Sequence, residues 1–128
     1  MSYLLDTHTL LWFIAGDSML PKRIKTLIQS TNTPCFVSIV SIWEIVIKKQ
    51  IGKLEFGMEL TELFNYIERN KIEILPMELV HFIELSNLPL VHSDPFDRII
   101  ISQAIAEKMI ILGCDVKFHN YDVLIEWK

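Results

Sequence analysis

Residues 92–112 read HSDPFDRIIISQAIAEKMIIL, a stretch in which a helix signal is followed by a strand signal. Asp94 and Pro95 predict a helix start, because an Asp side chain accepts hydrogen bonds from the free N–H groups of a first turn and proline suits the first helical position. Apolar residues then recur at helical spacing, which predicts a helix over Pro95–Glu107 with one buried face. The run MIIL at 109–112 is too short and too apolar for a half-exposed strand, so we expect a strand buried on both faces.

The same alternation of strand and helix signals extends over the rest of the chain. Short apolar runs lie at 3–5, 35–37 and 72–75, and we expect these strands too to be buried on both faces. A last short strand is expected at 123–126. Helical patterns separate them, near Thr7–Ile14, Pro21–Gln29, Ser41–Lys49, Glu59–Glu68 and Glu78–Leu85. This order indicates an α/β fold with a short, mostly parallel central sheet. No repeat, low-complexity tract or linker marks a second domain, so we expect residues 1–128 to form a single domain.

The composition is that of a globular chain with a real core. Of its 128 residues 51% are hydrophobic, and the formal net charge is -4. That charge argues against a general nucleic-acid coat protein. If four of the 16 acidic residues held cations, 12 acidic residues would remain to balance the 12 basic ones. A nucleic-acid substrate is therefore compatible with the composition.

The cysteines and the N-terminal stretch bear on the compartment. Cys35 and Cys114 form no C-x-x-C pair and lie in apolar runs, so we expect two buried, reduced thiols, as suits a cytoplasmic protein. The N-terminal stretch lacks the basic region of a secretion signal, and no apolar run approaches the length of about 18 residues that a membrane span needs.

Four acids lie where predicted strands end or the following helices begin. Asp6 directly follows the strand at 3–5, Asp115 follows the strand at 109–112, Glu44 lies in the expected first turn of the helix after CFVS, and Asp97 lies in the first turn after Asp94. Ligands of open parallel sheets bind beyond the carboxyl ends of the strands. Carboxylates gathered there would repel one another unless Mg²⁺ or Mn²⁺, which prefer oxygen ligands, lay between them. Such ions promote phosphodiester hydrolysis, so the set predicts a metal-dependent nuclease.

Each acid taken alone also has a purely structural explanation. Asp94 suits the helix cap, and Asp97 suits the positive end of the helix dipole. Ser41-x-x-Glu44 matches a capping box, in which Glu44 would only satisfy the backbone of Ser41. Asp6 and Asp115 could likewise cap the segments that follow them. The set is therefore more specific than any one of its members.

Four stretches carry a family resemblance. LLDTHTLLW, VSIVSIWEIVIKKQIGKL, HSDPFDRIIISQA and ILGCDVKFHNYDV, in that order and spacing, resemble the PIN-domain ribonucleases, and specifically the VapC-type toxins of bacterial toxin-antitoxin pairs. The resemblance runs from Tyr3 to Val123. It implies a three-layer α/β/α fold, Mg²⁺- or Mn²⁺-dependent RNA cleavage by a metal-activated water, frequent homodimers and inhibition by a small antitoxin. Transfer RNA is one candidate among the possible RNA substrates.

The resemblance also assigns residues. The family's acidic metal ligands fall on Asp6, Glu44, Asp97 and Asp115, with Asp94 as an accessory acid at the same site. The family usually has Thr or Ser two residues before its last acid, and this sequence has Gly113 there. A hydroxyl that would hold a metal-bound water or orient the last acid is therefore missing.

Other side chains near these acids have two interpretations each. Arg98 and Lys48 are candidates for contact with a substrate phosphate, with solvated surface charge as the alternative. Thr9 and Ser38 could offer hydroxyls to the metal shell or cap a helix. The histidines match no zinc-site spacing, and we expect them to be non-catalytic.

Aromatic residues and two helices raise the question of partners. Trp12, Phe13 and Trp43 could stack an unpaired RNA base, although core or interface packing is the commoner role of such residues. The helices at 21–29 and 59–70 are expected to form a groove for an amphipathic antitoxin helix.

Two other functions are compatible with the sequence. In the first, the acids survive only as caps and the protein is a catalytically silent PIN-like interaction module, for which Gly113 is the best support. In the second, Asp6 is a covalent phosphoryl acceptor. The segment DTHT lacks the second aspartate expected two residues on in such phosphatases, so this function ranks last.

Overall fold

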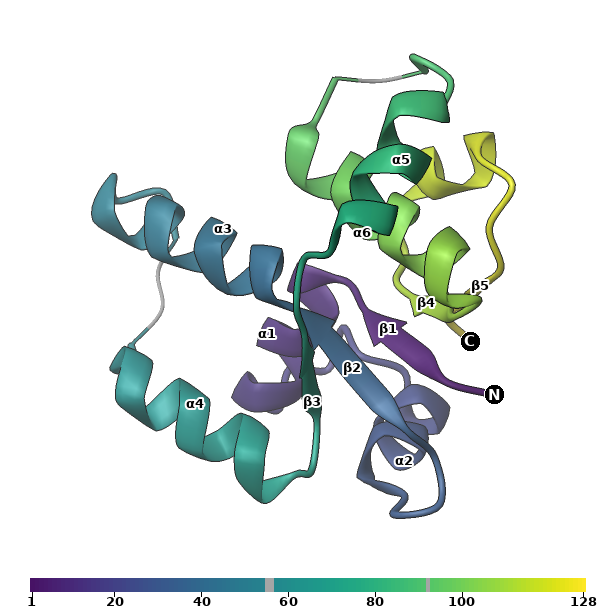
Figure 1. The fold of residues 1–128 in the computed structure, drawn as a ribbon. Coiled ribbons are helices and arrows are strands. Elements are labelled where there is room, and N and C mark those ends of the chain that lie inside the picture. The colour runs from purple at the N-terminus through teal and green to yellow at the C-terminus, as the bar shows by residue number, and fades with distance from the viewer. Residues whose placement is uncertain (55–56, 92) are drawn as a thin grey trace.

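The computed structural model describes residues 1–54, 57–91 and 93–128; the predicted non-catalytic role of His92 lies outside them. A five-stranded sheet in the order β3-β2-β1-β4-β5 runs through its centre, and each pair of neighbours is parallel (Figure 1). The strands are β1 (Tyr3–Leu5), β2 (Cys35–Ser38), β3 (Glu73–Leu75), β4 (Ile110–Leu112) and β5 (Ile125–Glu126). The predicted α/β fold with a mostly parallel sheet is confirmed.

The helices lie between the strands along the chain, as predicted. They are α1 (Thr7–Ala15), α2 (Lys22–Gln29), α3 (Ile39–Gln50), α4 (Leu60–Arg69), α5 (Leu79–Asn87) and α6 (Pro95–Glu107). A short 3-10 helix, η1 (Val116–Asn120), was not predicted as an element. It forms because the Asp115 side chain accepts a hydrogen bond from the Lys117 N–H at 2.9 Å, which is the capping role that the sequence allowed for this acid.

Both faces of the sheet are covered at β1, β2 and β4, as their apolar runs predicted. The same expectation for the run at 72–75 is wrong, because β3 is an edge strand on which Glu73 and Ile74 are exposed. Successive residues of one strand point to opposite faces, so Leu5 and Val37 pack with α1 to α4, whereas Leu4 packs with α6 and η1 on the other side. Helices therefore cover the sheet from both sides in three α/β/α layers (Figure 1). Within the described residues no helix is both long enough and apolar enough to cross a membrane.

The strand order places a switch point beside β1. The chain passes from β1 to β2 and β3 on one side of the sheet, and then returns to β4 on the other side of β1. The Asp6 N–H donates to the Leu112 carbonyl at 3.0 Å, and Thr9 Oγ1 donates to the same carbonyl at 2.7 Å. These bonds hold the ends of β1 and β4 together at the point where open α/β sheets bind ligands.

Two predictions of local structure are wrong. Helix α3 begins at Ile39, not Ser41, because the Ser38 side chain accepts a hydrogen bond from the Val40 N–H at 3.0 Å and so caps the helix. Cys114 is exposed rather than buried, since it follows the end of β4; Cys35 on β2 is buried as expected.

Candidate active site

Asp6 lies at the carboxyl end of β1 and caps α1. Its Oδ1 accepts a hydrogen bond from the Thr7 N–H at 2.7 Å, and the side chain is almost entirely buried. Burial, and then the negative charge of Asp97, raise the pKa of Asp6 from 3.8 to about 7, and Glu44 and Asp115 add to this rise. A helix-capping hydrogen bond alone would favour the ionised carboxylate and lower the pKa. The raised pKa of Asp6 therefore results from its burial and from the negative charges of the other acids.

Asp97 is the second acid with a strongly raised pKa. Asp94 begins α6, because its Oδ1 accepts from the Phe96 N–H at 2.9 Å and from the Asp97 N–H at 3.2 Å. Burial raises the pKa of Asp97 from 3.8 to about 7, followed by the charges of Asp94, Asp115 and Glu44. The Lys117 charge opposes this rise. Asp94 therefore has the capping role proposed for it, and its charge still acts on Asp97.

Glu44 lies in the second turn of α3, so its predicted place in the first turn and in a capping box with Ser41 is wrong. Its carboxylate is buried and accepts a hydrogen bond from the Thr7 hydroxyl at 2.8 Å. Its other oxygen lies 2.6 Å from Lys48 Nζ, one turn along the helix. The hydrogen bond to Glu44 raises the pKa of Lys48, and the charges of Asp94 and Asp97 add to that effect.

The four predicted acids therefore act on one another although they come from four distant parts of the chain. Asp115 is half-buried at the start of η1, and its charge raises the pKa of both Asp6 and Asp97. All the donors are carboxylate oxygens, which suit Mg²⁺ or Mn²⁺. Over residues 1–54, 57–91 and 93–128, however, no three or more Asp, Glu, His or Cys side chains are arranged so that they could hold a metal ion. The carboxylate oxygens suit such an ion, but the side chains of the four acids would have to move to coordinate it together.

Gly113 lies against Asp6. A Cβ atom added at Gly113 would lie 3.1 Å from Asp6 Cβ, 3.2 Å from Phe118 Cε2 and 3.4 Å from Asp6 Oδ2. The first two distances are tighter than ordinary van der Waals contacts, so the absence of a side chain lets the end of β4 approach the buried carboxylate closely. The departure from Thr or Ser at this position has a packing explanation.

Arg98 is not displayed toward a substrate. Its guanidinium donates to the Pro89 carbonyl at 2.7 Å and to the Tyr121 hydroxyl at 3.3 Å, and only 9% of the residue is exposed. The predicted phosphate contact of Arg98 does not fit this placement, because the guanidinium is occupied in joining α6 to the segment before it. Lys48, by contrast, lies among the acids.

The hydroxyls and aromatic residues named from the sequence have separate places. Thr9 and Ser38 are used in the backbone contacts of the fold. Phe13 is buried in the core, and Trp12 packs against Trp127 with 5.7 Å between the ring centroids. Trp43 is different, because much of its side chain is exposed.

Two residues near the acids were missed by the sequence analysis. Thr7 donates to Glu44, and Lys117 acts on Asp97. Thr7 directly follows Asp6, and Lys117 lies two residues after Asp115. Their nearness along the chain to two of the acids was the available signal.

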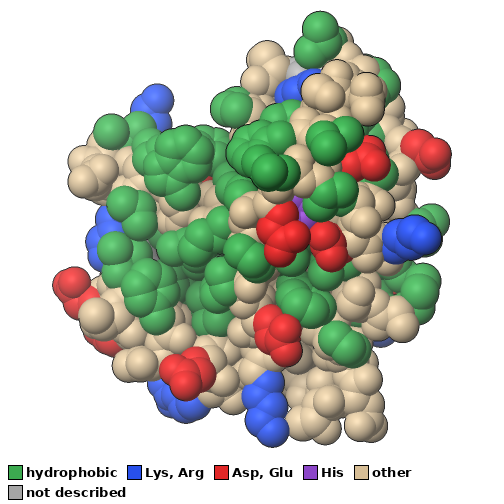
Figure 2. Space-filling model, viewed as in Figure 1, with side chains coloured by type: hydrophobic (Ala, Val, Ile, Leu, Met, Phe, Trp, Pro, Cys, Tyr) green, Lys and Arg blue, Asp and Glu red, His purple; other side chains and the backbone are tan. Residues whose placement is uncertain are grey.

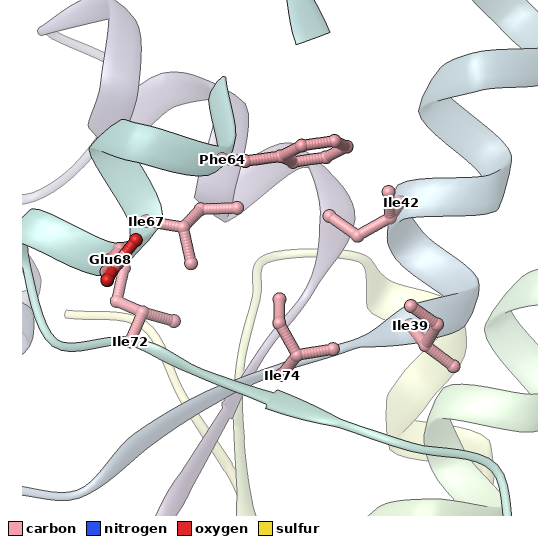
Figure 3. A pocket seen from close by; sticks show the side chains of 7 residues that line it. All are labelled: Ile39, Ile42, Phe64, Ile67, Glu68, Ile72 and Ile74. Atoms are coloured by element: carbon pink, nitrogen blue, oxygen red, sulfur yellow. The ribbon is translucent and has the colours of Figure 1, made fainter. Parts of the chain in front are cut away.

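An apolar groove lies apart from the acids, between α3, α4 and β3. It has a volume of about 410 Å³ and is lined by Ile39, Ile42, Phe64, Ile67, Glu68, Ile72 and Ile74 (Figure 3). Figure 2 shows hydrophobic side chains gathered around a hollow in this region. The predicted groove between the helices at 21–29 and 59–70 is corrected in part, because α4 lines the groove while its other walls are α3 and β3.

Comparison with known proteins places this geometry in context. The model of the PIN domain family matches residues 3–124. No curated protein sequence matches the chain. Among solved structures, the chain is similar to VapBC2 from Rickettsia felis bound to a DNA fragment from its promoter, with a TM-score of 0.75, 18% identity and coverage of 100% of both chains. It is also similar to VapBC-1 from nontypeable Haemophilus influenzae, with a TM-score of 0.72, 15% identity and coverage of 98% of this chain and 97% of that chain. DNA-bound VapBC from Salmonella typhimurium gives a TM-score of 0.68, with 14% identity and coverage of 98% and 97%.

Proposed function

The chain belongs to the PIN domain family, and we propose that it is the toxin of a type II toxin-antitoxin pair, an endoribonuclease that hydrolyses RNA with Mg²⁺ or Mn²⁺. One observation carries the proposal: the buried carboxylates of Asp6 and Glu44 both bind Thr7, at 2.7 Å to its N–H and at 2.8 Å to its hydroxyl, in an acidic cluster that raises the pKa of Asp6 and Asp97 to about 7. Repulsion between these acids destabilises the folded protein when no cation is bound, and cations bound between the acids would relieve that repulsion. We place this activity in the cytoplasm.

Each acid has a role in this proposal. Asp6, Glu44, Asp97 and Asp115 would hold the ions, and Asp94 would start α6 and add negative charge. Bound Mg²⁺ or Mn²⁺ would supply a water of lowered pKa and neutralise charge on the phosphodiester. The chain's own residues position the acids: the Thr7 N–H fixes Asp6, and the Thr7 hydroxyl fixes Glu44. If a metal ion coordinated Glu44, the Lys48 ammonium group would be released from this ion pair and could contact a substrate phosphate.

A catalytically silent PIN-like interaction module remains the second candidate. The observation in its favour is that no group of three acids, His or Cys in the described residues is arranged to hold a metal. Gly113 no longer favours it, since a close approach to Asp6 accounts for that residue. The two candidates differ in whether Mn²⁺ binds at the acids.

We assign the antitoxin to the groove between α3, α4 and β3. Its lining is apolar apart from Glu68, which lies on α4. An amphipathic helix that lays its apolar face on Ile42, Phe64 and Ile74 would bury this surface. A Phe64→Asp variant should then lose the antitoxin while keeping RNA cleavage.

A homodimer would use another apolar surface, on α5. Leu79 is 81% exposed, and Val80, Phe82 and Ile83 are also exposed on the same short helix. Monomeric proteins seldom leave such a contiguous apolar surface uncovered, and we assign it to a second copy of the chain. Sedimentation of the wild type and of Ile83→Asp would test this assignment.

The nuclease is tested by cleavage of labelled total RNA and transfer RNA with Mg²⁺, Mn²⁺ or a chelator. The wild type is compared with Asp97→Asn and with Asp122→Asn, an exposed acid that serves as the matched control. Discrete, metal-dependent products that disappear only in Asp97→Asn support the proposal. Absence of cleavage by folded wild type at saturating metal, or full activity of Asp97→Asn, would refute it.

A further inference from the structure

An aromatic pair joins the two helices that carry Glu44 and Asp97. Trp43 on α3 and Phe96 on α6 meet edge to face, with ring centroids 5.3 Å apart and ring planes at 77°. Each aromatic residue directly precedes one of these acids in the sequence. The two rings therefore leave their helices at backbone positions next to those of Glu44 and Asp97, although consecutive residues of a helix point in directions about 100° apart.

Trp43 is exposed although it is held in place. Its exposed fraction is 57%, whereas Phe96 is half-buried beneath it. An edge-to-face contact restrains the indole and leaves much of its surface free. The other aromatic residues considered from the sequence have other partners, since Phe13 packs in the core and Trp12 packs on Trp127. An exposed, restrained indole beside a reaction centre can present a flat surface to a ligand.

The charges around the acids bear on how an RNA ligand would be held there. Lys48 is paired with Glu44, Arg98 is occupied inside the fold, and the whole chain has a net charge of -4. Lys48, once an ion holds Glu44, and Lys117 can attract the phosphate backbone, but this attraction is the same for every RNA sequence and does not fix the position of a base. Base stacking on an aromatic side chain does not depend on charge and accepts any base.

We propose that Trp43, braced by Phe96, is a stacking platform for an unpaired base of the RNA next to the phosphodiester that is cleaved. This inference rests on the proposed nuclease function and adds to it a residue that positions the substrate. A base inside a duplex has both faces covered by its neighbours and cannot stack on the indole unless it leaves the helix. Trp43 is thus a substrate-positioning residue, separate from the acids.

The kinetic test compares Trp43→Ala, Trp43→Phe and a matched control, Ile51→Ala. Ile51 directly follows the same helix and is 58% exposed, so its loss removes a similar apolar surface away from the pair. We expect Trp43→Ala to raise KM for single-stranded RNA by about 10-fold, equivalent to about 1.4 kcal/mol. Trp43→Phe should keep most of the affinity, and Ile51→Ala should match the wild type. Equal KM values for all four proteins would overturn the proposal.

A binding test separates this proposal from the nuclease itself. Trp12→Phe and Trp127→Phe leave Trp43 as the single tryptophan, and Ca²⁺ replaces Mg²⁺ so that binding is followed without reliance on cleavage. Short single-stranded RNA should quench Trp43 fluorescence, and a duplex of the same length should not. Quenching supports the platform even if no RNA is cut, in which case the nuclease proposal fails alone. If fluorescence anisotropy shows that RNA binds but Trp43 fluorescence is not quenched, the stacking role of Trp43 is wrong. It is also wrong if Trp43→Ala changes the oligomeric state and leaves RNA binding unchanged.

Discussion

Replacing Asp6 with Asn should stabilise the metal-free protein. The substitution removes the charge from a buried acid of the cluster and keeps an oxygen that can accept from the Thr7 N–H, because Asn is as good a helix cap as Asp. The Asp6 carboxyl group is only 5% exposed, and the charges of Asp97, Glu44 and Asp115 act on it, so its ionisation destabilises the fold. The substitution removes this destabilising contribution. A residue of the proposed site thus opposes the stability of its own fold.

The magnitude follows from the raised pKa. In the folded chain the pKa of Asp6 is about 7, against 3.8 for an ordinary aspartate. At about 1.4 kcal/mol for each pKa unit, this difference gives about 4 kcal/mol at neutral pH as an upper value. Water at the rim and rearrangement of the other acids reduce it, so we expect Asp6→Asn to raise the free energy of unfolding by about 2 to 4 kcal/mol at pH 7.

The pH dependence has a definite sign. Between pH 4 and pH 7 the unfolded chain releases the Asp6 proton while the folded chain retains it, so the folded state binds more protons and the contribution of Asp6 to stability falls as the pH rises. Asn does not titrate. The advantage of Asp6→Asn should therefore shrink to about 0.5 kcal/mol at pH 4, where the folded wild type keeps almost the whole Asp6 proton and the unfolded chain still keeps more than a third of it.

Urea unfolding in the presence of a chelator measures this effect at pH 4, 5.5 and 7. Asp122→Asn, at an exposed position, is the matched control and should change stability by no more than about 0.5 kcal/mol. Added Mg²⁺ should stabilise the wild type more than Asp6→Asn, since an ion that binds only the folded chain adds to its stability. A destabilised Asp6→Asn at pH 7, or a gain that is the same at all three pH values, would refute the electrostatic reasoning.

Three further substitutions test the packing of the site and of α5. Arg98→Ala should lower the free energy of unfolding by about 2 to 4 kcal/mol, because the carbonyls that the guanidinium satisfies become unpaired; unchanged stability with a raised KM for RNA would instead restore the phosphate contact. His81→Ala should cost about 2 to 4 kcal/mol and speed hydrogen exchange in α5, because the buried ring contacts Glu107 at 2.8 Å and accepts from the Glu78 N–H at 3.0 Å; unaltered exchange would show that other contacts hold α5. Gly113→Ala should cost about 1 to 3 kcal/mol and weaken Mn²⁺ binding in calorimetry, since the new Cβ would press on Asp6; unchanged stability and affinity would contradict the close approach.

The sequence alone determined most of the architecture. The helix signal of Asp94 and Pro95 placed the start of α6 correctly, and short apolar runs placed β1 to β5. These features depend on capping and on hydrophobic periodicity, which are encoded within a few neighbouring residues. The positions of the acids relative to the strand ends follow from the same local signals, so the sequence could predict that Asp6 and Asp115 meet at one edge of a parallel sheet.

Only the tertiary structure decided what the side chains do there. Ser38 and Ser41 are both suitable caps, and the packing of α3 selected Ser38, which moved Glu44 into the second turn. Arg98 follows a site acid in sequence, yet its guanidinium points to backbone carbonyls of another segment. The raised pKa values of Asp6 and Asp97 arise from burial and from the charges of other acids, most of which lie far away along the chain. Burial, charge coupling and side-chain direction are sums over neighbours in space, and these neighbours exist only once the chain has folded.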